Sequence, residues 1–320
     1  MADARDTLLL PFAQGLVPEP DKDWLFFEAR PLPGNALSEV QCEQGHRGFH
    51  LALQDAGYDT APQRDAGDRA GTLVLANRNR IANERNLARA WNATREGGHV
   101  VFVGDTNSSV KALRKWAGQR AQVSGSLSKH HAVVFWLVKE GGQWPLPEAP
   151  VVKHEFHVAP GMFSARDIDK GSALLAEQFP GKLHGRVADF GAGWGYLSAK
   201  ALDVGVTDIS LYEADHAALE AAKINAPQAA DYHWCDLTRE APRGPFDTII
   251  MNPPFHTGRA AEPALGAAFI EAASKALPQG GRLLMVANTR LPYEAVVTQH
   301  FRRFSALVER DGFKVLEAVR

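Results

Sequence analysis

The second half of this 320-residue chain alternates short apolar runs with helical patterns, and this alternation constrains the fold more than any other feature. Apolar runs that suit buried strands lie at 185–190, 208–212, 246–251 and 281–287, and helical patterns lie at 196–202, 217–225 and 262–277. Strands that alternate with helices form a parallel sheet covered on both faces. We therefore predict an α/β fold for this half, closed by a last strand at 313–319.

The first half of the chain shows a fainter version of the same pattern. Each copy reads as a strand, a polar loop that starts with Asn, a helix, two glycines and a second strand. The matching segments are Thr72–Arg80 with Asp247–Phe255, and Gly97–Asp105 with Gly280–Asn288. Two generic α/β units would also look alike for physical reasons alone. Because the Pro-rich stretch at 141–150 reads as a linker, we predict two related domains, at 1–145 and 146–320.

Composition excludes several classes of protein. The chain is 45% hydrophobic but has no apolar run long enough to span a membrane, and its first residues lack the apolar region of a signal peptide. Two cysteines, Cys42 and Cys235, form neither a disulfide framework nor a metal-ligand spacing. We therefore expect a cytoplasmic globular protein without a metal site.

Positive charge is concentrated in one segment of the first half. Residues 77–131 carry a net charge of +7, whereas the whole chain carries −2. A basic segment in a mildly acidic protein can bind phosphates, although solvated helix faces would give the same composition. The ten basic residues are Arg78, Arg80, Arg85, Arg89, Arg95, Lys111, Arg114, Lys115, Arg120 and Lys129.

A glycine-rich loop follows the first predicted strand of the second half. The stretch 187–197 reads VADFGAGWGYL, so a strand ends in an acid and glycines open a helix. Gly191 and Gly193 would let the backbone approach a ligand closely. A loop of this kind is weak evidence alone, and its spacing does not fit the dinucleotide fingerprint well because the third glycine, Gly195, comes too early.

Polar residues stand at the ends of four successive predicted strands: Asp189, Glu213, Asp236 and Asn252. Open α/β sheets bind ligands at the carboxyl ends of their strands. Glu213 could accept hydrogen bonds from both ribose hydroxyls of an adenosine cofactor, and Asp236 could accept from the adenine amino group. Each acid alone would read as a helix cap or a solvated loop residue, but together they predict a cofactor site.

The loop Asn252-Pro253-Pro254-Phe255 predicts the chemistry. A planar amine such as guanine N2 is a weak nucleophile, and it can attack the methyl of S-adenosylmethionine (SAM) only as its nitrogen becomes tetrahedral. Two acceptors on its N–H bonds, the Asn252 side-chain oxygen and the Pro253 carbonyl, would favour that change. The prolines stiffen the loop, and Phe255 offers a face on which a base can stack. The alternative is a rigid turn with Phe255 in the core.

At these residues the chain resembles the ribosomal RNA guanine-N2 methyltransferases of the small-subunit methyltransferase C type, with its large-subunit relative G. The motifs are GMFSARDIDKGSALL at 161–175, VADFGAGWGYLS at 187–198, FDTIIMNPPFHTG at 246–258, LMVANTRLPY at 284–293 and GFKVLEAVR at 312–320. They occur together in that family and cover the C-terminal half of this chain. The family often has Asp where Glu213 stands, and often Cys or Gly around Trp194.

The resemblance implies two tandem class I (Rossmann-like) methyltransferase domains. The N-terminal one would be degenerate, with an RNA-binding or structural role. It further implies that SAM is held by Asp189, Gly191, Gly193, Glu213, Asp236 and Asn252, and the target base by Asn252, Pro253, Pro254 and Phe255. Asp169 and Gly171 lie in the segment that closes over the cofactor in relatives.

We therefore expect SAM-dependent methylation of the exocyclic N2 of a guanine in ribosomal RNA, with 16S rRNA within the small subunit as the expected partner. A monomer is expected. Guanine N2 in 23S rRNA, adenine N6 and a protein glutamine amide stay open, although enzymes for the last two usually carry Tyr where this chain has Phe255. A non-catalytic RNA-binding assembly factor is a further alternative. A nicotinamide-dependent dehydrogenase would leave the Pro-Pro loop unexplained.

Overall fold

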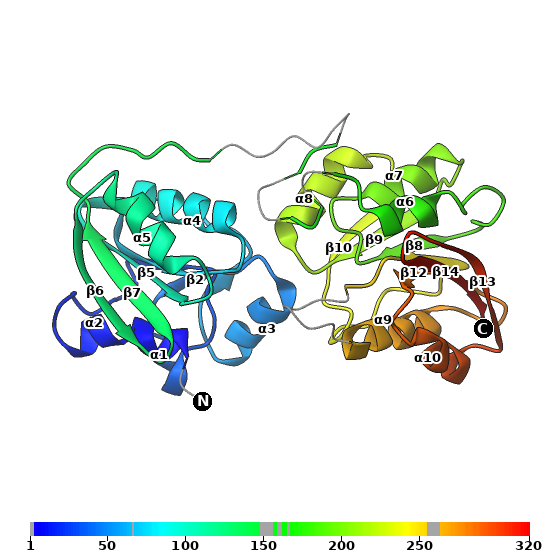
Figure 1. Cartoon of the computed structure of the whole chain (residues 1–320), viewed down its shortest axis with the longest axis horizontal. Helices are drawn as coiled ribbons and strands as arrows, with labels where there is room; N and C mark the ends of the chain where they lie inside the picture. The colour runs from blue at the N-terminus through cyan, green and yellow to red at the C-terminus, as the bar shows by residue number, and fades with distance from the viewer. Residues whose placement is uncertain (1–2, 66, 148–155, 159–161, 165–166, 255–262) are drawn as a thin grey trace. The chain divides into compact units, whose positions relative to one another are not determined.

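The computed structural model describes residues 3–65, 67–147, 156–158, 162–164, 167–254 and 263–320. The chain divides into two compact units, Met1–Glu148 and Ala149–Arg320, which we call the N-unit and the C-unit. Each contains its own seven-stranded sheet (Figure 1). No helix among the described residues is long and apolar enough to cross a membrane.

The sheet of the C-unit runs in the order β10-β9-β8-β11-β12-β14-β13. Its first five strands pair in parallel, and β14 and β13 are added antiparallel. The strands are β8 (Val187–Phe190), β9 (Ile209–Glu213), β10 (Asp231–Trp234), β11 (Thr248–Met251), β12 (Arg282–Asn288), β13 (Arg303–Arg310) and β14 (Phe313–Val319). The predicted parallel α/β sheet is therefore confirmed.

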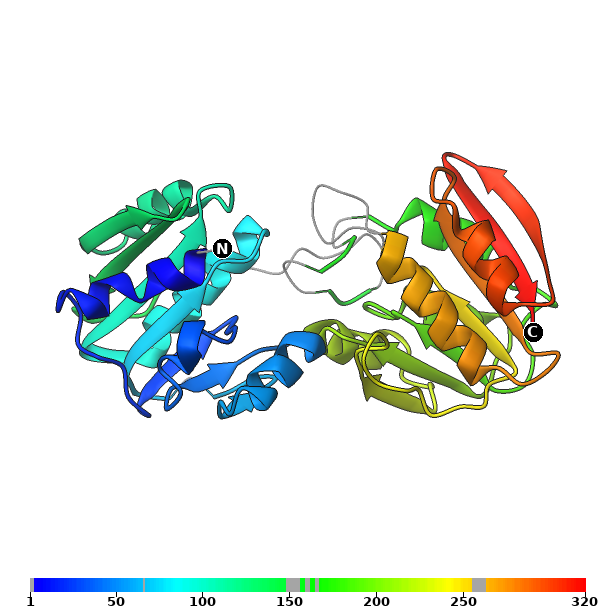
Figure 2. The ribbon, with the colours of Figure 1, turned by 90° about the horizontal axis from the view of Figure 1, so that it is seen from below.

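Helices cover both faces of this sheet. They are α6 (Lys170–Ala176), α7 (Tyr196–Asp203), α8 (His216–Asn225), α9 (Pro263–Ala276) and α10 (Tyr293–His300). The first three pack their apolar side chains on one face, and α9 and α10 lie side by side on the other (Figures 1 and 2). Strands β8 and β11 are buried along their whole length between these layers, which explains why their sequences read as continuous apolar runs.

The N-unit has the same strand order, β3-β2-β1-β4-β5-β7-β6, with the last two strands again antiparallel. Its strands are β1 (Trp24–Phe27), β2 (Gln41–Glu43), β3 (Thr60–Ala61), β4 (Arg69–Leu75), β5 (Thr94–Asp105), β6 (Val123–Lys129) and β7 (Ala132–Val138). Its helices are α1 (Ala4–Leu8), α2 (Leu10–Ala13), α3 (Arg47–Asp55), α4 (Arg80–Ala93) and α5 (Val110–Gly118). The two units are thus copies of one methyltransferase fold.

The N-unit departs from the C-unit directly after its first strand. Where the C-unit has α7, the chain between β1 and β2 forms only a short 3-10 turn, η1 (Pro33–Asn35). The equivalence of Asn77 and Asn252 that was predicted from the sequence is wrong. Phe27 pairs with Val74, and Phe190 pairs with Met251, so Leu75, and not Asn77, takes the place of Asn252. The two Asn residues matched because both open a polar loop, whereas the pairing register fixes the true equivalence.

Candidate active site

The glycine loop joins β8 to α7 and has left-handed backbone at its glycines. Gly193 has φ +56°, and a Cβ atom there would meet no atom within 4 Å, so its surroundings are open. Gly195, with φ +88°, lies against α8, and a Cβ atom there would come within 3.0 Å of Ala222. The positive φ values favour glycine at both positions, but only at Gly193 is the freed space available to a ligand.

Glu213, at the end of β9, forms a hydrogen bond with this loop. Its Oε2 accepts a hydrogen bond from the Gly193 amide at 2.7 Å, and its Oε1 accepts one from the Asp215 amide at 2.8 Å. Desolvation raises the pKa of the Glu213 carboxyl to about 7, against the lowering effect of these backbone donors. Glu213, which was predicted to bind the ribose, therefore already connects the glycine loop to the start of α8 through its two hydrogen bonds.

Asp189 lies fully buried in β8. Its Oδ2 accepts a hydrogen bond from the Ser198 hydroxyl at 2.7 Å, while Oδ1 has no partner among the residues that the structure describes. Burial, followed by the nearby Glu213 carboxyl, raises the pKa of Asp189 to about 7. A buried carboxylate oxygen without a donor is costly, so this atom is poised to accept from a ligand or to stay protonated.

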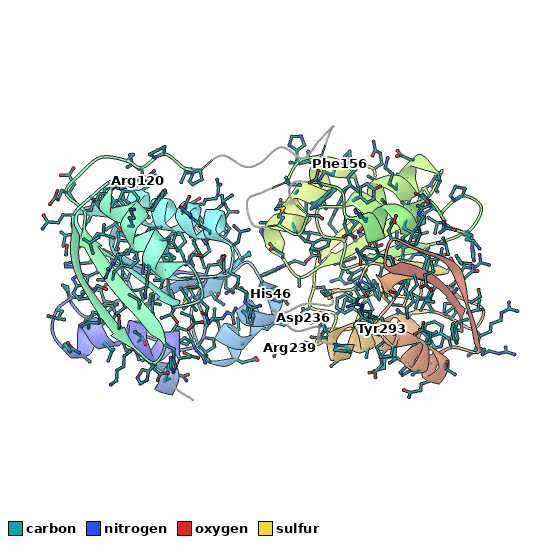
Figure 3. All side chains as sticks on the ribbon, in the orientation of Figure 1. His46, Arg120, Phe156, Asp236, Arg239 and Tyr293 are labelled. Carbon is teal, nitrogen blue, oxygen red and sulfur yellow. The ribbon has the colours of Figure 1, made fainter. Side chains whose placement is uncertain are left out.

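Asp236 stands two residues beyond the end of β10. Its Oδ1 accepts from the Thr238 amide at 3.0 Å and from the Thr238 hydroxyl at 2.6 Å, so the side chain caps a turn. It does not line the cavity described below, and its position is labelled in Figure 3. The structure thus gives Asp236 a local role, and its predicted contact with adenine stays a prediction.

Asn252 follows β11 directly, and only the nitrogen of its side-chain amide forms hydrogen bonds with described residues. Its Nδ2 donates to Asp169 Oδ2 at 2.9 Å and to the Ser172 hydroxyl at 2.8 Å. Its Oδ1 is buried and has no hydrogen-bond partner within the described part of the chain. Pro253 is buried and Pro254 is exposed. Phe255, predicted as the stacking face for the base, lies outside the described residues.

A cavity of about 50 Å³ brings these elements together. Its lining comes from the glycine loop, the start of α7, the start of α6, two residues that precede α6 and the residue after β11: Phe163, Ser164, Asp169, Ser172, Gly191, Ala192, Gly193, Trp194, Tyr196, Leu197 and Asn252. The cavity thus brings together Gly191, Gly193 and Asn252 of the predicted site residues, whereas Asp189, Glu213 and Asp236 do not line it, and its binding of a cofactor stays a prediction. This volume is only part of what a nucleoside cofactor fills, because ligand pockets usually measure about 300 Å³ or more.

Three contributors to this site were missed by the sequence analysis. Ser172 binds the Asn252 amide, and Trp194 donates its Nε1–H to the Phe163 carbonyl at 2.9 Å. Asn225, at the end of α8, donates to the Trp194 carbonyl at 2.7 Å. Asp169 is a typical N-cap residue before an apolar run, which was the one available signal for this helix start. The other contacts join segments about thirty residues apart, for which no local pattern exists.

An aromatic cluster attaches the stretch around Phe156 to the glycine loop. The ring of Phe156, labelled in Figure 3, lies 5.1 Å from that of Trp194 and 5.8 Å from that of Tyr196. The Asn225 side chain also bonds the backbone of His157 in both directions, at 2.7 and 2.8 Å. Residues 156–158 are therefore held against the same loop that lines the cavity.

Comparison with known proteins agrees with this geometry. The profile of a family described as "Methyltransferase small domain" matches residues 153–317. Ribosomal RNA small subunit methyltransferase C of Shewanella loihica is 34% identical over 241 residues, which are 68% of each chain. The same-named protein of Hahella chejuensis is 30% identical over 246 residues, or 71% of each chain.

The fold of a solved structure matches along almost the whole chain. It is a 16S rRNA N2 guanine methyltransferase from T. thermophilus in complex with AdoMet and guanosine. It is 25% identical, has a TM-score of 0.81, and the match covers 99% of this chain and 91% of that one. The chain therefore belongs to the methyltransferase small-domain family and, within it, to the ribosomal RNA small subunit methyltransferase C proteins.

Proposed function

We propose that this protein transfers a methyl group from SAM to the exocyclic N2 of a guanine in ribosomal RNA, with 16S rRNA as the substrate. One observation carries the proposal: Asn252 Oδ1 is a buried acceptor without a donor, beside a glycine loop of methyltransferase type. An atom of this kind is costly unless a ligand supplies the missing hydrogen bond. The amino group of guanine is such a donor, and the family relationship agrees with it.

The residues present fit SAM as the methyl donor. The orphaned Oδ1 of the buried Asp189 suits the ammonium of the methionine part, because a positive charge there would favour the ionised carboxylate. The open surroundings of Gly193 suit close backbone approach, beside Gly191. Glu213 would accept from the ribose and Asp236 from the adenine. When bound, SAM supplies an electrophilic methyl group on a positively charged sulfonium.

The protein's own groups then prepare the amine. Asn252 Oδ1 and the Pro253 carbonyl accept hydrogen bonds from the two N2 protons of guanine, so the nitrogen becomes tetrahedral and its lone pair is withdrawn from conjugation with the ring. Pro253 has no N–H that could compete for these acceptors, Pro254 keeps the loop stiff, and Phe255, which lies outside the described residues, would offer its ring to the base. As the N–CH₃ bond forms, the S–CH₃ bond breaks and the methylated nitrogen becomes acidic. Its extra proton can then leave to water, and no strong base is needed.

The N-unit offers a basic surface on α5. Lys111, Arg114, Lys115 and Arg120 are all exposed, and none of them forms an ion pair with a described acid. The guanidinium of Arg120, labelled in Figure 3, lies 3.8 Å from the centre of the Trp116 ring. We assign the contacts with RNA phosphates to this surface.

Three other arginines of the basic segment form ion pairs within the protein. Arg89 pairs with Glu43 at 2.6 Å, Arg80 with Glu84 at 2.8 Å and Arg95 with Asp23 at 3.1 Å. The first of these pairs is mostly buried. These three arginines are therefore less available to phosphates than the exposed cations of α5.

The test is the transfer of labelled methyl from SAM to unmodified 16S RNA, small subunits, 23S RNA and bulk protein in parallel, followed by nuclease digestion. We expect N2-methylguanosine from 16S material, and the comparison of naked RNA with subunits identifies the substrate form. Label in 23S RNA would retain the chemistry and change the target. Label in protein, or none despite SAM binding, would contradict the proposal.

A further inference from the structure

We propose that Asp169 is a positioning residue, which together with Ser172 fixes the Asn252 amide in the one orientation that presents Oδ1 to the substrate. This inference rests on the proposed function, because it presupposes Asn252 Oδ1 as the acceptor for the target amine. It assigns to the start of α6 a part in methyl transfer beyond lining the site.

The Asn252 side chain has two N–H groups, and both are used. One donates to Asp169 Oδ2 at 2.9 Å and the other to the Ser172 hydroxyl at 2.8 Å. A carboxylate can only accept, so a flipped amide would place its own oxygen against the Asp169 oxygen. Such an acceptor-to-acceptor contact is repulsive at this distance. The amide is therefore locked with Nδ2 toward α6 and Oδ1 away from it.

Asp169 is itself held in place by two features. It is the N-cap of α6, and the same Oδ2 atom accepts from the Ser172 amide at 2.8 Å. Gly171 and the Phe313 ring pack closely around this carboxylate. A Cβ atom on Gly171 would lie 2.9 Å from the Phe313 ring and 3.1 Å from Asp169 Oδ2. The carboxylate is thus fixed both by the helix and by packing.

The consequence is a preorganised acceptor. Without Asp169 the Asn252 amide would have two orientations of similar energy, and one of them would point a donor at the N–H groups of the amine. A negative charge next to Nδ2 also polarises the amide and makes Oδ1 a better acceptor. Both effects act when positive charge develops on the amine, so they should appear in kcat and not in cofactor affinity.

Two substitutions separate this role from helix capping. Asp169→Ser keeps an N-cap of similar quality, but its shorter side chain cannot reach Asn252. Asp169→Asn keeps both the cap and an acceptor oxygen at the same place. We expect a kcat loss on the order of 10-fold to 100-fold for Asp169→Ser and a much smaller loss for Asp169→Asn, with the SAM dissociation constant unchanged in both.

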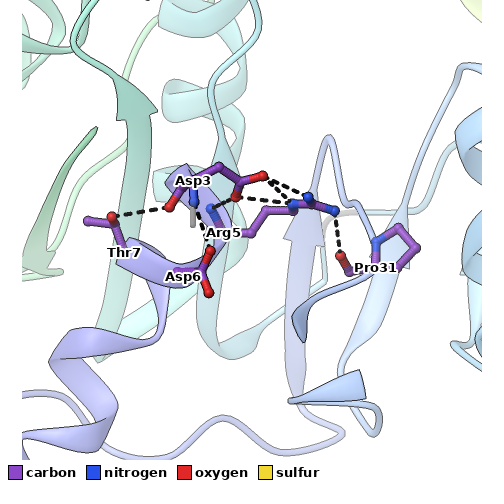
Figure 4. A network of polar contacts seen from close by, with 5 residues as sticks. All are labelled: Asp3, Arg5, Asp6, Thr7 and Pro31. Carbon is purple, nitrogen blue, oxygen red and sulfur yellow. Dashed lines mark hydrogen bonds and ion pairs between the residues drawn. The ribbon is translucent and has the colours of Figure 1, made fainter. Parts of the chain in front are cut away.

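A matched control is available in the N-unit. Asp3 is the N-cap of α1: it accepts from the Arg5 amide at 2.7 Å and also forms an ion pair with the Arg5 side chain, within the network shown in Figure 4. Asp3→Ser therefore changes an N-cap Asp to Ser without touching Asn252. It should leave kcat unchanged, and thermal unfolding would show whether either cap variant alters the fold.

The decisive measurement is a double-mutant cycle in single-turnover assays. In the Asn252→Ala background, Asp169→Ser should cause no further loss, because the amide that it orients is gone. An equal fold-loss in both backgrounds, a matching rise in the SAM dissociation constant, or unchanged turnover of Asp169→Ser would each overturn the inference. Ser172→Ala is the second variant and should lower kcat in the same direction. If Asn252→Ala itself keeps wild-type turnover, the proposed function fails at Asn252, which is a separate result.

Discussion

The two units carry the same sheet, yet they differ in the residues at the carboxyl ends of its strands, where described residues of the C-unit line a cavity of about 50 Å³. Their equivalence can be followed through hydrogen bonds: Ala192 donates to the Tyr212 carbonyl at 3.1 Å, and Ala29 donates to the Glu43 carbonyl at 3.2 Å. Gln44 therefore takes the place of Glu213. The likeness extends to the next turn, where Gln44 Oε1 accepts from the His46 amide at 2.8 Å, as Glu213 does from Asp215.

At this edge several residues of the N-unit differ in character from their counterparts in the C-unit. By strand register, Phe26 stands at the place of Asp189 and Leu75 at the place of Asn252. Glu28 takes the place of Gly191 and keeps its left-handed backbone, with φ 56°. The Gln44 amide donates to the Ala29 carbonyl at 2.7 Å and so holds the shortened loop.

In the N-unit, side chains of the protein itself form hydrogen bonds with Glu28, the residue at the place of Gly191. The Glu28 carboxylate accepts from Asn86 Nδ2 at 3.1 Å and from Asn77 Nδ2 at 3.4 Å. These bonds satisfy polar groups that a ligand would otherwise have to satisfy. One backbone architecture therefore supports either a site or a closed protein surface, and a few strand-end residues decide between them.

The largest expected effect comes from removing the acceptor that distinguishes the units. Asn252→Ala should lower kcat by about 10²-fold to 10³-fold while keeping SAM affinity, as for loss of one oxyanion-hole donor. The measurement is single-turnover methyl transfer with calorimetry of SAM binding. Asn77→Ala is the control in the N-unit and should leave turnover unchanged. Wild-type turnover of Asn252→Ala would remove Asn252 from the chemistry.

The second largest effect is expected from a substitution that gives the C-unit, at the end of β9, the residue type of the N-unit. Glu213→Gln should weaken SAM binding by about 10-fold or more, because hydrogen bonds to a charged group contribute about 1.5–3 kcal/mol. Calorimetry measures both the affinity and the number of sites. The reverse change, Gln44→Glu, should not create a second SAM site, since Phe26 and Glu28 remain. Unaltered affinity of Glu213→Gln would reject the ribose assignment.

The basic surface of the N-unit should affect RNA binding alone. Reversing Arg114 and Lys115 to Glu should raise the RNA concentration for half-maximal rate by about five-fold at moderate salt, without changing SAM affinity. Reversing Arg302 and Arg303, an exposed pair in the C-unit, changes net charge by the same amount. If both double variants weaken RNA binding equally, the effect comes from net charge and α5 is only solvated surface.

The smallest expected effect is the pH dependence of the C-unit. The pKa values of Asp189 and Glu213 are raised to about 7 from 3.8 and 4.5. The folded state therefore retains protons that the unfolded chain has lost, so these groups lower the free energy of unfolding as pH rises from about 4 to about 7. SAM affinity should change in the opposite direction and increase as pH passes through 7, because the ionised forms accept its donors.

Calorimetry across this pH range measures the affinity, and thermal unfolding measures the stability. Asp189→Asn should make both the SAM affinity and the free energy of unfolding less dependent on pH. A pH profile that is the same for this variant and the wild type would mean that Asp189 does not titrate as its burial implies. The N-unit, with Phe26 and Gln44 at the equivalent places, provides no such pair.

Much of the site was predictable because it follows the strand period. Asp189, Glu213 and Asn252 each stand at the end of an apolar run that is buried on both faces, and parallel strands bring such ends to one edge. Elements with weaker patterns were missed. The exposed strand β13 has little alternation, and α6 and α10 are short. The role of Asp236 as a turn cap could not be distinguished from that of a ligand by position alone.

The sequence by itself determined the parallel sheet, the glycine loop, the order of the strand-end acids and the family, because these depend on local periodicity and on motifs within one segment. Tertiary structure decided which of those residues face a cavity, and it paired Asn252 with Asp169 across 83 positions of sequence. It also showed that Leu75 and Gln44 stand at the places of Asn252 and Glu213 in the N-unit. Contacts between distant segments depend on sheet register and packing, which no short stretch of sequence encodes.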